Sequence, residues 1–260
     1  MRLSWRTCIP FLLLTLGLPS FGTAQVRLSH MQHITLDPGH GGFQPGTIAE
    51  DGTPEKKLTL AIALKVEKLL RTYTNARVTL TRRTDQFVGL RERTRIANQV
   101  GSDLLLSIHC NGSHSEHSHG VETYFLAYDS ANAEIAKMVE REERMEEQPN
   151  PAAPATNAPP NMLTKILEET SRFGAHADSE KVAEVILKHL HTDLKARRRG
   201  VFQAPFAVLK EADMPAVVVE VGFLSHAKEG QKLKGKAYQN KIAKAIYKSI
   251  IELDRNLTRR

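Results

Sequence analysis

The sequence predicts a single α/β domain with a mostly parallel sheet, helices on both faces of that sheet, and a glutamate-rich helical and proline-rich insertion. Apolar runs with strand character alternate along the chain with stretches of helical periodicity, which is the pattern of a parallel α/β sheet. No internal repeat divides the chain, and its 260 residues, with a hydrophobic content of 41%, suffice for one large core.

The expected strands and helices follow one another in a regular order. Strands are expected at residues 32–37, 77–81, 103–109, 121–127, 206–209 and 216–222. The first helix is expected to begin at Thr53, the predicted N-cap, with Pro54 in the first helical position. Apolar side chains that recur every three or four positions predict further helices at residues 90–100, 179–196 and 237–253.

One segment, at residues 129–177, breaks this alternation. Residues 131–148 have the pattern of a charged helix with many glutamates, and residues 149–160 are rich in proline, alanine and asparagine. A stretch of the second composition cannot build a core. A further short helix is expected at residues 161–172, and we interpret the whole segment as an insertion carried by one domain.

The first 24 residues have the layout of a cleavable secretory signal. Arginines supply a basic start, residues 9–18 are apolar, and small residues precede Gln25. The apolar stretch is too short to span a bilayer, and no later stretch is apolar enough to do so. We therefore expect residues 1–24 to be a signal peptide and the protein to be secreted without a stable membrane span; an uncleaved N-terminal anchor is the alternative.

The charge and the cysteines are consistent with export. The formal net charge is +7, and loss of Arg2 and Arg6 with the signal leaves +5. A basic exported protein suits an anionic polymer such as a cell wall, whereas export argues against nucleic acid as a partner. Cys8 lies in the signal, so the remaining chain keeps only Cys110 and forms no internal disulfide. We expect a monomer.

A glycine-rich turn with one histidine follows the first expected strand. Residues 36–42 read Leu-Asp-Pro-Gly-His-Gly-Gly, which places His40 on a tight turn at the C-terminal end of a strand. His109 ends a second apolar run in a similar context, and sites in open α/β sheets form at this edge. A lone histidine of this kind is more often structural, but two at parallel strand ends favour a shared site.

Two glutamates complete the candidate site. Glu55 lies in the first turn of the helix after the glycine-rich turn, from which it can reach His40; a favourable interaction with the helix dipole is the alternative. Glu220 interrupts an apolar strand, where a charge needs a partner or a function. Burial would raise the pKa of Glu220, which suits a general base, although a buried salt bridge is also open.

Two histidines, one carboxylate and an open position make up a catalytic zinc site. His40, Glu55 and His109 fit the ligand roles, and Glu220 fits the base that takes a proton from water and passes it to the leaving amine. Asp37 is a candidate acceptor that would orient a ligand histidine. Cys110 follows His109 directly, but strand alternation is expected to turn its side chain away from the metal.

These motifs resemble the zinc-dependent N-acetylmuramoyl-L-alanine amidases of the amidase 3 family, and in particular the periplasmic cell-wall type. The resemblance spans residues 31–254, and His226 departs from the asparagine that is common in the family. The matching stretches are residues 36–42, 54–56, 81–85, 90–93, 97–98, 107–111, 208–209 with 214–215, and 219–225. By resemblance, His40, Glu55 and His109 bind Zn²⁺, and Glu220 is the catalytic glutamate.

The resemblance also implies the reaction and a means of control. Residues 25–260 would be the amidase catalytic domain, which hydrolyses the amide bond between N-acetylmuramic acid and L-alanine in peptidoglycan, for cell-wall remodelling and daughter-cell separation. In amidases of this type, an inserted helix can cover the zinc site until a protein activator displaces it. The acidic residues of the insertion that could occupy the open zinc position are Glu142, Glu143, Glu146 and Glu147.

Three other functions stay open on the sequence alone. A zinc peptidase that cuts within the stem peptide would use the same metal chemistry. A non-catalytic wall-binding or activating protein would have no need of Glu220. A periplasmic metal-binding protein built on the histidine-rich loop at residues 113–120 would still bind metal after replacement of His40 and His109. We expect no separate wall-targeting module.

Overall fold

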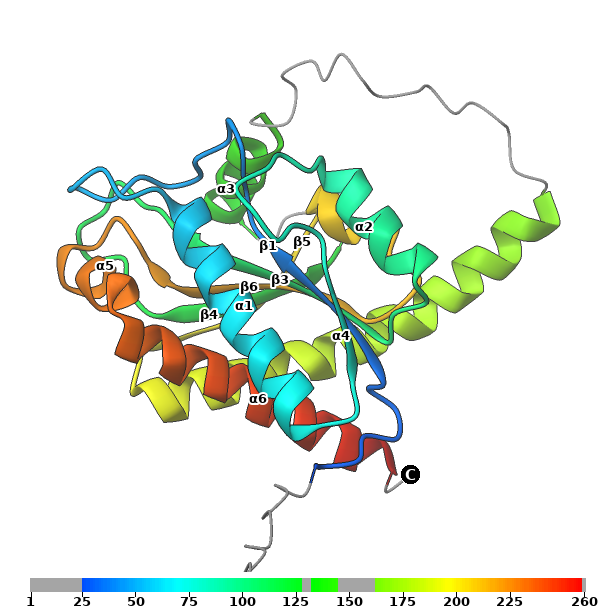
Figure 1. The fold of residues 1–260 in the computed structure, drawn as a ribbon. Coiled ribbons are helices and arrows are strands. Elements are labelled where there is room, and N and C mark those ends of the chain that lie inside the picture. Colours follow the sequence, from blue (N-terminus) through cyan, green and yellow to red (C-terminus); the bar gives the residue numbers. More distant parts are fainter. Residues whose placement is uncertain (1–24, 128–131, 145–161, 259–260) are drawn as a thin grey trace, which may run out of the picture.

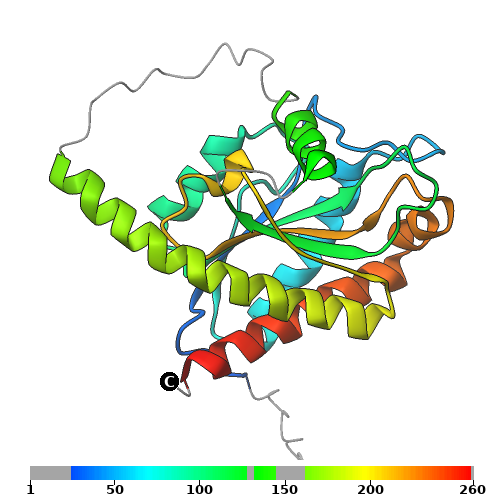
Figure 2. The ribbon, with the colours of Figure 1, turned by 180° about the vertical axis from the view of Figure 1, so that it is seen from behind.

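In the part of the chain that the structure describes, six strands form one sheet in the order β2-β1-β3-β6-β4-β5 (Figures 1 and 2). The computed structural model describes residues 25–127, 132–144 and 162–258, of which residues 143–144 and 162–176 are described by their backbone alone. The strands are β1 (His33–Pro38), β2 (Arg77–Leu80), β3 (Leu104–Asn111), β4 (Val121–Leu126), β5 (Arg198–Ala204) and β6 (Ala216–Phe223). Strands β2, β1, β3 and β6 run parallel to one another, whereas β4 is antiparallel to β6 and parallel to β5. The predicted mostly parallel α/β sheet is confirmed.

Helices cover both faces of this sheet, as the prediction required. One face packs against α1 (Glu55–Tyr73), α4 (Met162–Leu194), α5 (Ala227–Lys234) and α6 (Lys236–Thr258), and together they form the larger apolar core. The other face packs against α2 (Leu90–Gln99), α3 (Ala133–Arg144) and the 3₁₀ helix η1 (Ala207–Leu209) around a smaller core. Alternate side chains of one strand enter different cores, since Leu104 and Leu106 face the larger core and Leu105 faces the smaller one.

Several local predictions need correction. The helices expected at residues 161–172 and 179–196 are parts of one continuous helix, α4. The expected strand at residues 206–209 is the 3₁₀ helix η1, and β5 and α5 were not expected. The first helix is capped by Pro54 rather than Thr53, and that cap makes no side-chain hydrogen bond.

Two predicted segments lie outside the described residues. They are the signal peptide at residues 1–24 and the proline-rich stretch at residues 149–160. Among the helices that are described, none has a stretch both long enough and apolar enough to cross a membrane.

Two buried arginines hold the turn that follows β1. Arg82 donates to the carbonyls of Pro38 and Gly39 at 2.9 and 2.8 Å, and Arg93 donates to those of Pro38 and His40 at 2.9 and 3.0 Å. His40 has a φ of 58°, in the left-handed region that residues other than glycine seldom adopt. The two guanidinium groups thus donate hydrogen bonds to the carbonyls of this turn at the point where its backbone is strained. Burial lowers the pKa of Arg82, and the positive charge of the neighbouring Arg93 lowers it further, to about 10.

Asp37 balances the charge of these arginines beneath the turn. Its carboxylate accepts hydrogen bonds from Arg93 at 2.7 Å, Thr81 at 2.6 Å and Ser107 at 2.7 Å. Burial opposes ionisation of this carboxyl, but Arg93 and the two hydroxyls lower its pKa below the usual value. Among the described residues, the hydrogen-bond partners of Asp37 are these three groups and include no histidine, so the expectation that Asp37 orients a ligand histidine is not borne out.

Replacement of Arg93 by alanine should destabilise the protein severely. The substitution leaves Asp37 charged and buried without its cation, which typically costs about 3–5 kcal/mol. Arg95→Ala is the matched control on the same helix, because Arg95 is exposed and pairs with Glu92 at the surface; its loss should cost at most about 0.5 kcal/mol. Urea unfolding curves measure both, and equal midpoints would contradict the proposed importance of the buried pair.

Candidate metal centre

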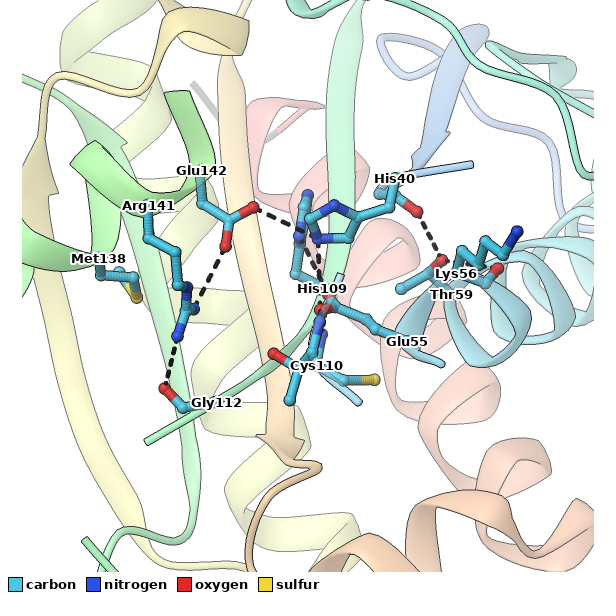
Figure 3. Close-up of polar contacts among 12 residues, drawn as sticks. His40, Glu55, Lys56, Thr59, His109, Cys110, Gly112, Met138, Arg141 and Glu142 are labelled. Atoms are coloured by element: carbon cyan, nitrogen blue, oxygen red, sulfur yellow. Dashed lines mark hydrogen bonds and ion pairs between the residues drawn. The ribbon is translucent and has the colours of Figure 1, made fainter. Parts of the chain in front are cut away.

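Three predicted ligands converge at the C-terminal edge of the sheet (Figure 3). His40 comes from the turn after β1, Glu55 is the first residue of α1, and His109 lies near the end of β3. The Glu55 carboxylate lies between the imidazoles, with one oxygen 3.2 Å from Nε2 of His40 and the other 3.2 Å from Nδ1 of His109. The rings of His40 and His109 meet edge to face at 4.9 Å. The structure thus brings these three residues together.

Backbone amides fix the Glu55 carboxylate in this position. One oxygen accepts the N–H of Thr47 and the other accepts the N–H of Cys110, each at 2.8 Å. Burial alone would raise the pKa of Glu55, but His40 and His109 hold it well below the usual range. The carboxylate is therefore ionised at neutral pH and is pre-positioned by one N–H group from the loop before α1 and one from strand β3.

A fourth group, Glu142 of α3, reaches the same point. Its Oε2 lies 3.3 Å from Nε2 of His40. His40, His109 and Glu142 each offer one atom to a group compact enough to hold a metal ion. Nε2 of His40 is buried and makes no hydrogen bond in the part of the chain that the structure describes. A buried imidazole nitrogen that lies close to two carboxylate oxygens but forms a hydrogen bond with neither fits a cation site.

Helix α3 is seated so that Glu142 points into the site. Ile135 and Val139 are buried in the smaller core, and their spacing of four and then three positions places Glu142 on the same helical face. Arg141 donates to the carbonyl of Gly112 at 3.0 Å and lies 3.2 Å from the Glu142 carboxylate. Of the four glutamates that the expectation named, the structure describes the side chain of Glu142 alone, and this side chain lies at the candidate metal centre. The side chains of Glu143, Glu146 and Glu147 lie outside the described part of the chain.

Glu220 stands beside His109 without a partner for one of its oxygens. Parallel pairing of β3 and β6 places Glu220 level with His109 in the sheet. Its Oε2 is buried and makes no hydrogen bond among the described residues. Burial raises the pKa of Glu220 well above the usual value, and the nearby carboxylates of Glu55 and Glu122 raise it further. These are the properties of a proton acceptor that operates near neutral pH.

Glu122 is a buried neighbour of Glu220 that the sequence analysis missed. Antiparallel pairing of β4 and β6 sets Glu122 directly opposite Glu220. Asn111 and Tyr124 donate to its Oε1 at 2.5 and 2.8 Å, and Arg199 forms an ion pair with its other oxygen. The signal that identified Glu220, a charge within a strand-like run, is also present at residues 121–127 and could have identified Glu122.

Other sequence expectations have mixed outcomes. Cys110 is buried in the larger apolar core and is not part of the metal group, as strand alternation predicted. The histidine-rich loop places His119 against His226, with ring centroids 5.3 Å apart. Among the described residues, this loop gathers no set of three metal-ligating side chains. Arg82, Arg93 and Arg141 were given no role by the sequence analysis, because nothing in a single sequence shows which arginines are buried.

The fold and this site define a class: an α/β protein with a candidate metal site at the C-terminal edge of its sheet. A family model described as N-acetylmuramoyl-L-alanine amidase matches residues 34–252. The chain therefore belongs to this family, and it is an enzyme of the amidase type.

Individual relatives agree with this assignment. The chain is 34% identical to N-acetylmuramoyl-L-alanine amidase AmiA of Escherichia coli (strain K12) over 84% of this chain and 74% of that protein. It is 33% identical to a probable amidase AmiB of Haemophilus influenzae, over 84% of this chain and 51% of that protein. Among solved structures, the catalytic domain of CwlV from Bacillus (Paenibacillus) polymyxa var. colistinus matches with a TM-score of 0.64 and 29% identity, covering 85% of this chain and 97% of that one. The CwlD amidase of Clostridioides difficile, in complex with the GerS lipoprotein, matches with a TM-score of 0.64 and 25% identity, over 85% of this chain and 98% of that one.

Gly39→Ala should weaken metal binding without unfolding the protein. A Cβ atom at this position would lie 2.4 Å from the ring of His109, so that ring would have to move. We expect the affinity for a divalent cation to fall at least about tenfold, the scale found when the orientation of a ligand is disturbed. Metal content after dialysis against a competing chelator measures the loss.

Gly52→Ala is the control for this substitution. Gly52 has a φ of 80°, so the substitution carries backbone strain, but no atom lies within 4 Å of the added Cβ. This variant should lose some stability and keep its metal. If Gly39→Ala retains its metal fully, the close packing of Gly39 against the His109 ring is not required for metal binding.

Proposed function

We propose that this chain hydrolyses the amide bond between N-acetylmuramic acid and L-alanine in peptidoglycan, with Zn²⁺ as its cofactor. Membership of the amidase family supports activity on peptidoglycan. The observation that carries the mechanism is the meeting of His40, Glu55 and His109 beside Glu220, whose buried oxygen has no hydrogen-bond partner among the described residues. Two imidazoles with one carboxylate form a donor set that suits zinc.

In this proposal, His40, Glu55 and His109 hold the metal. Zn²⁺ bound there would lower the pKa of water toward about 7 and polarise the amide carbonyl. The N–H groups of Thr47 and Cys110 keep Glu55 oriented, and the arginine-held turn keeps His40 in its left-handed conformation. The chain therefore supplies a site whose geometry exists before substrate arrives.

Glu220 carries the proton transfers. It accepts a proton from the attacking water at Oε2 as the new C–O bond forms. It then gives that proton to the amide nitrogen of L-alanine as the C–N bond breaks, so that the products are a free carboxyl group on the sugar's lactyl arm and a free amine on the peptide. The raised pKa of Glu220 places both steps within reach of one carboxyl group near neutral pH.

Glu220→Gln should retain zinc and lose at least about a hundredfold in turnover, the usual scale for a lost general base. The substrate is purified murein, the enzyme is the chain from residue 25 onward, and products are identified by mass spectrometry with and without a chelator. Free stem peptides with intact glycan strands, lost with chelator and restored by zinc, would support the proposal. Products cut within the stem peptide would place the chain with the zinc peptidases, and full activity of Glu220→Gln would remove this residue from the mechanism.

We further infer that α3 inhibits the enzyme by placing Glu142 in the open position of the metal. The carboxylate reaches His40 Nε2, and the helix is anchored by Ile135 and Val139 and by the bond from Arg141 to Gly112. A protein activator that displaces α3 would expose the metal. The solved complex of the CwlD amidase with the GerS lipoprotein supports the idea that such amidases form complexes with other proteins.

Glu142→Ala should raise the murein-hydrolysing activity of the isolated chain by about tenfold or more, which corresponds to about 1.4 kcal/mol of lost inhibitory contact. Glu140→Ala is the matched control, because Glu140 is an exposed glutamate of the same helix. Release of stem peptide per unit time measures both variants at equal zinc occupancy. If Glu142→Ala is no faster than Glu140→Ala, the inhibitory role of Glu142 is rejected.

The cellular role follows as a proposal from the sequence and the family. We propose that residues 1–24 direct export to the periplasm, where the domain at residues 25–260, with its insertion at residues 129–177, acts as a monomer. Wall remodelling and daughter-cell separation would be its physiological function. No nucleic acid partner is proposed.

A further inference from the structure

We propose that Phe43, stacked on Phe87, is a platform for a sugar ring of the glycan strand next to the metal centre, an inference that rests on the proposed function. The two rings are stacked with centroids 4.5 Å apart and an interplanar angle of 29°. Although one face of Phe43 is covered by this contact, 57% of the residue is exposed. A flat aromatic face is therefore open to solvent at the rim of the site, three positions after His40.

The backbone beneath this pair is fixed with respect to the metal centre. Gly41 and Gly42 both have positive φ, and a Cβ on them would lie 2.2 Å from the carbonyl oxygen of Gln86 and 2.6 Å from the nitrogen of Phe87, respectively. Only residues without a side chain allow the two segments to approach so closely. The same close approach brings Phe87 under Phe43.

Polar contacts pin the same two segments together. Gly42 donates its N–H to Asp85 at 2.8 Å, and the Lys56 ammonium donates to the carbonyl of Gly42 at 2.6 Å and to Asp85 at 2.7 Å. Lys56 follows Glu55 directly in α1, so the platform is attached to the helix that carries a metal ligand. A ligand bound to Phe43 would consequently be held at a defined position relative to the metal.

The segment lies on the side of the site where substrate must enter. Figures 1 and 2 both place the loop after β1 beside α3, at the C-terminal edge of the sheet. In the proposed reaction, the scissile amide hangs from the lactyl arm of a muramic sugar, so this sugar lies within a few ångströms of the metal. An aromatic face at the rim is within range of that sugar or of its neighbour in the strand.

The chemistry around the pair favours a sugar over the acidic stem peptide. A pyranose ring presents C–H groups on its faces, which are attracted to the negative face of an aromatic ring, and its hydroxyls remain in water at the edge. Lys56 is paired with Asp85, and Arg82 is buried with its donors directed at backbone carbonyls. Lys56 and Arg82, which contact this turn, are thus committed to other groups, which leaves the apolar face of Phe43 as the feature offered to a ligand.

Binding can be observed directly, because the sole tryptophan of the sequence, Trp5, lies in the predicted signal. In the chain from residue 25 onward, Phe43→Trp places a single tryptophan at the platform, whose emission can be excited separately from that of the tyrosines. Its emission should shift on addition of murein glycan strands stripped of stem peptides and should not shift with free stem peptides. Ile48→Trp is the matched control, since Ile48 is equally exposed, at 57%, in the same loop, and it should respond to neither.

Kinetics test whether the platform contributes to catalysis. In the Glu142→Ala background, with zinc bound, Phe43→Ala and Phe43→Leu should raise KM for glycan-linked substrate about threefold to tenfold with little change in kcat, the scale of an aromatic stacking contact. Phe43→Tyr should restore the parent KM, and Ile48→Ala should leave it unchanged. Phe43→Leu keeps an apolar contact with Phe87, which separates loss of the aromatic face from loss of folding.

The outcomes separate this inference from the proposed function. If the Glu142→Ala chain releases stem peptides and the added Phe43→Ala or Phe43→Leu substitution leaves its KM unchanged, the platform is overturned and the amidase proposal stands. A fluorescence response of Phe43→Trp to stem peptides rather than to glycan would also overturn it. If Phe43→Trp binds glycan but the Glu142→Ala chain releases no stem peptide, the amidase proposal is contradicted and the platform is supported.

Discussion

The metal centre depends on one arrangement: two buried arginines that hold the carbonyls of the turn after β1. Without donors, this turn would bury three unsatisfied oxygens and a histidine in a left-handed conformation, each of which is costly. Arg82 and Arg93 satisfy them, and Asp37 neutralises the arginines through bonds that also fasten β1 to β3. The position of His40 is therefore a property of a charged network beneath the sheet edge.

The remaining ligands are placed by connections to this turn. Glu55 is fixed by N–H groups from the loop that continues the turn and from β3, so its carboxylate links both histidines. Thr59, one turn further along α1, donates to the carbonyl of Gly39 at 2.8 Å. Strand β3 then supplies His109, whose ring occupies the space left open by Gly39. The site is thus assembled from contacts between neighbouring backbone segments, which makes it rigid before a metal or substrate binds.

Much of this could be predicted from the sequence, because the signals were local. Alternating apolar runs predicted the sheet, and chemically unusual residues in apolar or glycine-rich surroundings predicted His40, Glu55, His109 and Glu220. The predictions that failed concern features that are set by contacts between distant parts of the sequence. The strand β5 was missed because its basic, half-buried sequence has no apolar pattern, and its place is set by pairing with β4. Glu142 could be named only as one of several acids, since its place beside His40 is set by the packing of α3 through Ile135 and Val139.

Helix α3 also affects Glu220, the proposed general base. Glu142 raises the pKa of Glu220, and Arg141, its neighbour in α3, lowers it, so their effects on the base oppose one another. Both side chains belong to the same helix, and removal of α3 would withdraw them together. Burial is the largest cause of the raised pKa, followed by the carboxylates of Glu55 in α1 and Glu122 in β4, which would stay in place. Displacement of α3 would therefore open the site to substrate while these two carboxylates remained beside Glu220 and still raised its pKa.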